Sequence, residues 1–244
     1  MINTLSKLSS ISQKHSASYI RFNSSLPITI SVLEELPLNR YNLLLGNREF
    51  TTKSHKPLKK GMKYWGNFGE GKDGVITISG LLQKPSFLQD EDEFLDVDIK
   101  DFFTKFQTLE FPTRYFKNWL LENMAVSEIP KSIFKSLSNM LLALNDGIIH
   151  LPFKSYDKPI LVQFQASFEN ELRFYLAYDN LGPIKGFLSR KNNQFELLID
   201  VLFEKSFFFL KRELETLQIP CFIKLNKEIA PLYEIDKMML DIRG

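Results

Sequence analysis

The sequence predicts a mixed fold, in which a small all-β barrel at the N-terminus is followed by helices and a C-terminal α+β domain. Apolar and polar residues alternate repeatedly within residues 26–84, a period typical of half-buried strands. Residues 98–146 instead carry apolar residues at helical spacing. In residues 171–225, three alternating segments precede one helical stripe and a last apolar segment. These observations predict two domains of different class.

The composition is that of a globular protein. The chain has 244 residues, of which 44% are hydrophobic and 25% are charged, and this length suits one large domain or two small ones. A net charge of +2 does not by itself indicate a nucleic-acid partner. No run of 18 apolar residues occurs, so the sequence predicts no transmembrane helix. The single cysteine, Cys221, cannot form an internal disulfide and is predicted to be a small buried side chain.

Residues 1–25 form a leader that we expect to be disordered. Eight of these residues are Ser, the basic residues are Lys7, Lys14 and Arg21, and the first acidic residue of the chain is Glu34. No apolar block of secretory-signal length is present. Three interpretations stay open: a plain disordered leader, a mitochondrial transit peptide and a type III export signal.

Residues 26–84 are expected to form the barrel. Five short segments have strand character: 28–32, 41–45, 49–52, 62–68 and 75–81. Gly46-Asn47-Arg48 and the segment 69–74 are the predicted turns between them. Five short strands are too few for a sandwich and suit a small barrel, because closure removes the exposed edges of a sheet.

A basic cluster on this predicted barrel supports an alternative function. Lys53, His55, Lys56, Lys59, Lys60 and Lys63 lie close together in the sequence, with Tyr64 and Trp65 beside them. Basic and aromatic surfaces of small barrels bind single-stranded nucleic acid. Lysines are also the ordinary residues of solvated loops, and Trp65 is expected in the core. Nucleic-acid binding is therefore the alternative function and not the first one.

Residues 85–97 are predicted to be an acidic linker. The carboxylates are Asp90, Glu91, Asp92, Glu93, Asp96 and, just beyond, Asp98. Their spacing does not match a calcium-binding loop, which needs acidic residues at alternate positions and a central Gly. We therefore expect a solvated connection with no bound metal.

The helical segment, 98–146, has two proline-marked helix starts. Pro112 and Pro130 each precede an apolar stripe, and a stripe at Ile99, Phe102, Phe103 and Phe106 comes before both. Asn145-Asp146-Gly147 is the predicted stop. These stripes are expected to pack against one another.

Residues 147–244 are expected to form the α+β domain. The predicted strands are 148–153, 160–168, 172–177, 184–189 and 195–201, followed by a helix from Phe203 to Leu217 and a closing strand at 221–225. The tail, 228–244, is expected to be a short helix packed on the sheet.

The motifs of common enzymes do not occur in this sequence. Gly69-Glu70-Gly71 lies between predicted strands and lacks the following helix of a phosphate-binding loop. His15, His55 and His150 are far apart and lack metal-ligand spacing. No Gly-x-Ser-x-Gly motif is found. We therefore expect a non-enzymatic protein with no cofactor, no metal and no small-molecule substrate.

Two parts of the chain resemble the flagellar hook-length control family. In that family's C-terminal domain a Pro-x-x-Leu-Gly turn is followed by a strand, a polar hairpin, a second strand and a Leu-rich helix. Asn180-Leu181-Gly182 stands at the turn, and 184–189, 194–202 and 203–217 follow in the same order. The segment 148–153 is similar to the family's Leu-Pro strand, and 41–46 with 54–61 are similar to a barrel found in some shorter members.

The sequence differs from the family at two points. Tyr178 stands at or near the position of the turn proline, and Pro183 follows the glycine instead. The chain also lacks the long Gln/Pro/Ala-rich region that acts as a molecular ruler in longer members. This second difference gives no support to a ruler role.

The resemblance implies a cytoplasmic protein of the flagellar type III export system, which is itself a candidate for export. It would bind the cytoplasmic domain of the export gate, with hook or hook-cap proteins as further partners, and switch export from hook to filament subunits. The partner-binding residues would be Asn180, Leu181, Gly182 and Pro183. Leu181 has two alternatives: it packs into the domain core, or it projects as an anchor for the partner.

Overall fold

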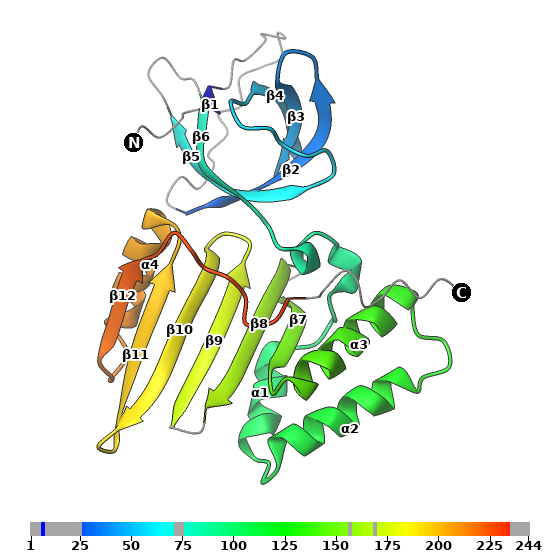
Figure 1. Ribbon diagram of the computed structural model, residues 1–244, viewed down its shortest axis with the longest axis vertical. Coiled ribbons are helices and arrows are strands. Elements are labelled where there is room, and N and C mark those ends of the chain that lie inside the picture. Colours follow the sequence, from blue (N-terminus) through cyan, green and yellow to red (C-terminus); the bar gives the residue numbers. More distant parts are fainter. Residues whose placement is uncertain (1–5, 8–25, 71–75, 156–157, 168–169, 235–244) are drawn as a thin grey trace.

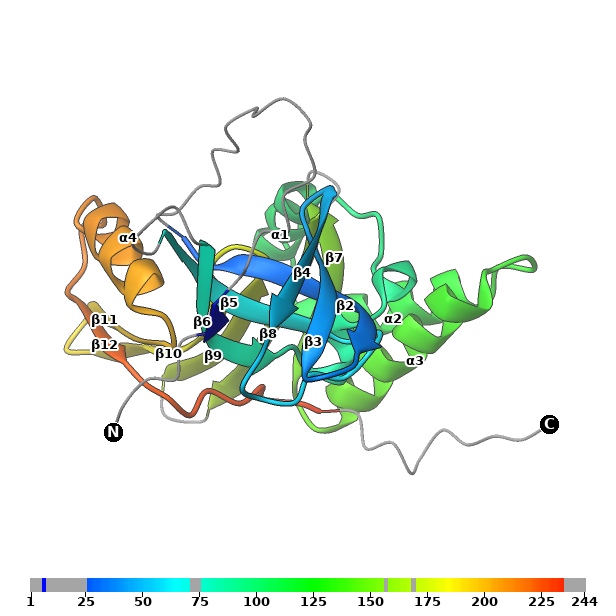
Figure 2. The same cartoon turned by 90° about the horizontal axis from the view of Figure 1, so that it is seen from above.

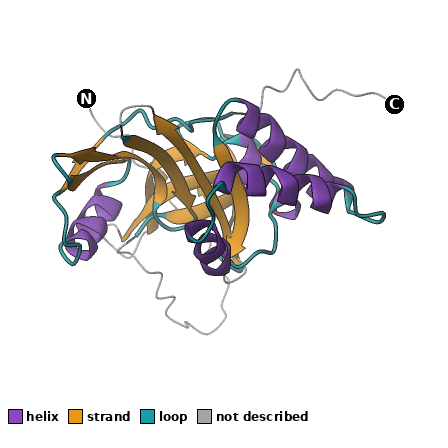
Figure 3. Cartoon of the chain, turned by 90° about the horizontal axis from the view of Figure 1, so that it is seen from below, coloured by secondary structure: helices purple, strands orange, loops and turns teal. Residues whose placement is uncertain are grey.

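The computed structural model describes residues 6–7, 26–70, 76–155, 158–167 and 170–234, which form two β-sheets and four α-helices (Figure 1). The mixed α/β prediction is therefore confirmed. The N-terminal sheet lies across one end of the C-terminal sheet, near the ends of β9 and β10 (Figure 1). The C-terminal sheet has α2 and α3 at one end and α4 at the other (Figures 2 and 3).

The N-terminal sheet has the strand order β1-β6-β5-β2-β3-β4. Its strands are β1 Ser6–Lys7, β2 Ile28–Leu36, β3 Arg40–Leu45, β4 Arg48–Lys53, β5 Lys63–Glu70 and β6 Ile76–Gln83. Their inward side chains include Ile30, Tyr41 and Leu43, all at most 2% exposed. The sequence pattern predicts β2 to β6 correctly, because each of these strands buries one face, whereas β1 lies in the leader that is expected to be disordered.

The closed barrel is not confirmed. The strand order ends at β1 and at β4, and in the described residues β1 pairs only with β6 and β4 only with β3. β1 and β4 come close to each other in space, but no ladder joins these two described strands. Apart from the two residues of β1, the predicted disordered leader, 1–25, lies outside the described residues.

The C-terminal sheet has the order β12-β11-β10-β9-β8-β7. Its strands are β7 Ile149–Ser155, β8 Lys158–Ser167, β9 Glu171–Tyr178, β10 Gly182–Lys191, β11 Gln194–Val201 and β12 Cys221–Leu225. β7 to β11 form an antiparallel meander. Helix α4, Glu204–Leu214, then carries the chain back so that β12 lies parallel to β11.

All four helices pack on one face of the C-terminal sheet. They comprise α1 Ile99–Gln107, α2 Pro112–Met124 and α3 Lys131–Asn145 at β7 and β8, and α4 near β11 and β12. Leu176 on β9 packs against both helix clusters. The two proline-marked starts are correct: Pro112 is the first residue of α2, and Pro130 directly precedes α3. The Asp98 side chain caps α1 by accepting hydrogen bonds from the N–H groups of Lys100 and Asp101.

The acidic segment between the sheets is packed against the fold, contrary to the expected solvated linker. Phe87, Leu88, Phe94 and Leu95 are all buried. Leu95 donates its N–H to the Pro152 carbonyl, and its own carbonyl accepts from the N–H of Lys154. These two hydrogen bonds form an isolated parallel bridge beside β7. The charge pattern does not reveal this, because the other carboxylates are exposed while Glu93 is buried and paired with Lys135, and the aromatic residues among them are buried.

The tail does not form the predicted short helix in its described part. Residues 226–234, which we call the C-terminal strap, run as an extended segment across the face of the sheet opposite the helices (Figure 1). Ile229 and Leu232 pack against the core that joins the two sheets. The remainder of the predicted tail helix, 235–244, lies outside the described residues.

Candidate partner-binding site

Of the predicted partner-binding residues, Asn180 and Leu181 lie in the turn between β9 and β10, and Gly182 and Pro183 begin β10. Asn180 is exposed, Leu181 is half-buried, and Gly182 and Pro183 are buried. Leu181 packs against the core cluster that contains Ile184. Of the four predicted residues, only Asn180 therefore presents a largely accessible side chain.

This turn is joined to the N-terminal sheet by polar contacts. Lys84 Nζ lies 2.5 Å from Asp179 Oδ1, and Thr29 Oγ1 donates to the same oxygen at 2.9 Å. Trp65 Nε1 donates to the Tyr178 carbonyl at 3.0 Å. Burial lowers the pKa of Lys84, and the Asp179 carboxylate partly opposes that shift. The turn is thus an internal junction between the two sheets.

The turn also positions the start of α4. Gly182 has a φ of +74°, and a Cβ at this position would lie 2.5 Å from the Phe203 ring. Ser206, near the start of α4, donates from its hydroxyl to the Leu181 carbonyl at 2.7 Å. Position 182 requires a glycine because its φ is positive and because the Phe203 ring leaves no room for a Cβ. The Leu-Gly motif therefore has a local structural cause.

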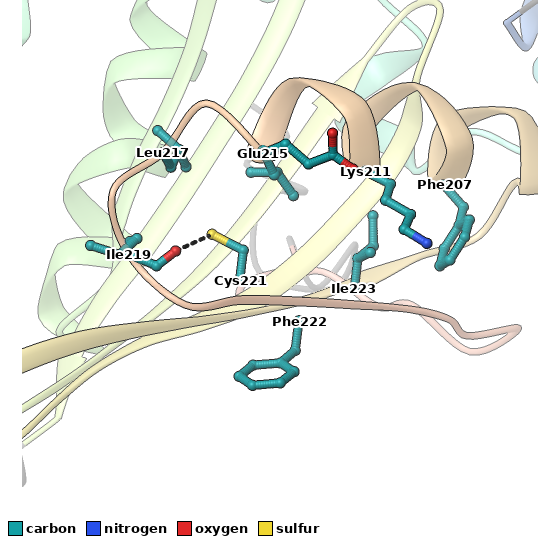
Figure 4. A pocket seen from close by; sticks show the side chains of 9 residues that line it. Phe207, Lys211, Glu215, Leu217, Ile219, Cys221, Phe222 and Ile223 are labelled. Atoms are coloured by element: carbon teal, nitrogen blue, oxygen red, sulfur yellow. Dashed lines mark hydrogen bonds between the residues drawn. The ribbon is translucent and has the colours of Figure 1, made fainter.

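An open groove lies between α4 and strand β12, with a volume of about 450 Å³. Figure 4 shows the side chains of Phe207 and Lys211 on one wall, with Cys221 and Ile223 on the floor. Phe222 points to the other side of the strand (Figure 4). The full lining is Phe207, Lys211, Leu214, Glu215, Leu217, Ile219, Cys221, Phe222 and Ile223. Lys211 and Glu215 are its charged residues.

Large apolar side chains are exposed on α4, on β12 and in the loop that joins them. Phe208 is 62% exposed, Phe222 56%, Leu225 51% and Leu217 46%. Strand β12 ends the sheet, and within the described residues its outer edge has no ladder partner. An exposed edge strand with large apolar residues can pair with another chain. This surface can therefore offer both backbone hydrogen bonds and apolar area to a protein partner.

Cys221 supplies the thiol on the floor of the groove. Burial raises the pKa of Cys221, so its thiol is not activated. The same thiol donates to the Ile219 carbonyl at 3.3 Å (Figure 4). In the part of the chain that the structure describes, no cluster of His, Cys, Asp and Glu side chains could hold a metal ion.

The basic cluster and the aromatic residues beside it do not form one accessible surface. Tyr64 and Trp65 are 6% and 1% exposed, and neither ring is accessible for base stacking. The Lys63 ammonium pairs with Glu91 at 2.6 Å. The lysines of the cluster therefore lie mostly in solvent, whereas the two aromatic rings next to them in the sequence are buried.

No protein-family model, curated protein or solved structure matches the chain. None of the helices in the described ranges is long and apolar enough to cross a membrane. Sequence reasoning missed Asp179, Lys84 and Thr29, which are far apart in the chain. It also missed the groove, although the apolar residues of 207–223 supply most of its lining.

Proposed function

We propose that this chain is a non-enzymatic protein of flagellar assembly that switches export from hook to filament subunits, as its resemblance to the hook-length control family implies. The observation that supports a protein partner is the apolar groove beside the free edge of β12. An edge strand supplies backbone groups for affinity, and neighbouring pockets supply specificity. The proposed partner is the cytoplasmic domain of the export gate, with hook or hook-cap proteins as further candidates.

The turn Asn180–Pro183 has a supporting role in this proposal. Asn180 is the accessible contact, while Leu181 and Gly182 orient α4 through Ser206 and Phe203. The first turn of α4 contacts this turn through Ser206, and residues further along α4 line the groove. Partner binding therefore depends on the turn through the position of α4.

Pull-down of the purified export-gate domain tests the contact. Leu217→Asp places a charge in the apolar lining of the groove and is expected to weaken capture at least tenfold while the melting temperature stays within about 2 °C, since Leu217 is 46% exposed. Leu38→Asp is the matched control, because Leu38 is 79% exposed in the turn between β2 and β3, on the N-terminal side of the fold. Equal capture by wild type and both variants would contradict the groove as the contact.

The cellular function is tested by deletion of the gene. Loss of the switch is expected to leave over-long hooks with few filaments, visible by electron microscopy. Hooks of normal length with full filaments in the deletion strain would remove the flagellar assignment. A salt titration against single-stranded oligonucleotides tests the alternative, since binding to phosphates weakens steeply with salt.

A further inference from the structure

A row of polar residues crosses the C-terminal sheet under the strap. The ladder register places one residue of each strand in line: His150, Gln163, Tyr175, Lys185, Asp200 and Lys224. Directly opposed residues share a face of the sheet, so all six belong to the face opposite the helices. The C-terminal strap lies along this face, from β12 toward β8 (Figure 1).

Gln163 binds the strap through its backbone. Its Oε1 accepts from the N–H of Leu232 at 2.8 Å and from the N–H of Tyr233 at 3.2 Å. Its Nε2 donates to the Tyr233 carbonyl at 2.9 Å and also contacts His150 Nδ1 at 2.9 Å. One buried amide thus satisfies three backbone groups of an extended peptide, and His150 orients that amide. Backbone contacts of this kind accept many sequences.

The floor and the strap are buried to different degrees. Gln163 and Tyr175 are 0% exposed and His150 is 1% exposed, whereas Ile229, Leu232 and Tyr233 are only half-buried. A segment that served packing alone would rest on an apolar floor, because buried polar groups are unfavourable unless they are hydrogen-bonded. The floor here is mixed: the hydrophobic core between the sheets holds Ile229 and Leu232, while the buried amide of Gln163 is complementary to a peptide backbone.

The far end of the strap is held in the same way. Asn226 donates from its side chain to Asp200 Oδ2 at 2.8 Å and from its N–H to the Val201 carbonyl at 2.9 Å. Between Asn226 and Leu232, the strap has no ladder pairing with any described strand. It is thus attached at two polar points and by half-buried apolar side chains.

We propose that this face is a binding site for an extended peptide, which the C-terminal strap occupies in cis. The partner it fits is a segment that offers two consecutive N–H groups and a carbonyl to Gln163, with an aliphatic side chain at the place of Leu232 and an aromatic one at the place of Tyr233. Such a segment binds when it displaces the strap. This inference goes beyond the proposed function and does not depend on the flagellar assignment.

The test uses the full chain and a fluorescent peptide with the sequence of residues 227–234, measured by anisotropy. The wild type is expected to bind this peptide weakly, because its own strap fills the site. Leu232→Ser weakens the strap and is expected to raise peptide affinity at least tenfold. Adding Gln163→Met to Leu232→Ser is expected to abolish that gain, because the methionine side chain cannot bond the backbone.

Three outcomes would overturn the proposal. The first is equal peptide binding by the wild type and Leu232→Ser. The second is a gain in affinity that survives Gln163→Met. The third concerns folding: Tyr233→Ala is a second strap variant, and loss of the cooperative melt in both strap variants would show that the strap is an integral part of the core.

Discussion

The Lys84 ammonium and the Asp179 carboxylate form an ion pair of 2.5 Å across the junction of the two sheets, and only 3% of the Lys84 side chain is exposed. Lys84 follows β6 directly, and Asp179 opens the turn after β9, so 95 positions separate them in the chain. Thr29 of β2 donates to the same carboxylate. This contact couples the orientation of the N-terminal sheet to the turn that positions α4.

Removal of Asp179 is expected to be more harmful than removal of Lys84. Asp179→Ala leaves a buried ammonium without its partner, which costs about 3–5 kcal/mol. Lys84→Met leaves a carboxylate that is 28% exposed and still accepts from Thr29, so we expect a loss of about 1 kcal/mol. Urea unfolding of both variants and of the double variant measures the coupling. Glu213→Ala is the control, because its pair with Arg212 is exposed; a loss as small in Asp179→Ala would contradict the prediction.

Gly182→Ala is expected to destabilise the C-terminal domain by about 2 kcal/mol or more. The new methyl group would meet the Phe203 ring at 2.5 Å, and the φ of +74° adds backbone strain. Gly46→Ala is the matched control, since Gly46 has a φ of +60° and no atom within 4 Å of the added Cβ. Thermal unfolding of the two variants separates strain from clash. Equal losses would show that Phe203 moves aside freely.

His150 is expected to make stability fall in mild acid. Burial lowers its pKa from 6.5 to about 3, so below pH 6.5 the unfolded chain binds a proton that the folded chain does not. Stability is then lost as the pH falls from about 6.5 toward 3, by about 2 kcal/mol between neutrality and pH 5. His150→Gln keeps an acceptor for Gln163 and removes the titration. Urea unfolding at several pH values should show a shallower pH dependence in this variant, and an unchanged slope would count against the prediction.

Phe94→Ala is expected to cost about 3–5 kcal/mol, because its ring is only 2% exposed and lies in the core between the sheets. Asp96→Ala, two residues further along the same acidic segment, is expected to change stability by less than about 0.5 kcal/mol, since Asp96 is exposed. Chemical unfolding compares the two. Similar small effects would restore the interpretation of 85–97 as a solvated linker.

Incomplete burial of its leucines limits what α4 contributes to stability. Leu210 and Leu214 contact the core cluster of Ile184, but both are only half-buried. Leu214→Ala is therefore expected to cost about 1–2 kcal/mol, below the usual range for a core leucine. Lys211→Ala, on the exposed side, should change the melting temperature little. Equal melting temperatures for the two variants would show that α4 adds little to stability.

Local order was determined by the sequence alone. Alternation located β2 and β11, and Pro112 and Pro130 located the starts of α2 and α3, because each of these signals depends only on neighbouring residues. The glycine at position 182 was likewise marked by its turn motif. For each strand or helix, the pattern distinguishes an apolar face from a polar one. It does so without any knowledge of which element packs on the apolar face.

The tertiary structure decided which surfaces meet. Asp179 and Lys84 became partners, the aromatic residues of the acidic segment became core, and the strap came to lie on the row that contains Gln163. The barrel was expected from strand number, but closure depends on pairing between the first and last strands, which periodicity does not encode. Periodicity defines which side chains share a face, whereas the partner of that face is set by contacts between residues far apart in the chain. For that reason the elements were predictable, while the junction, the groove and the strap were not.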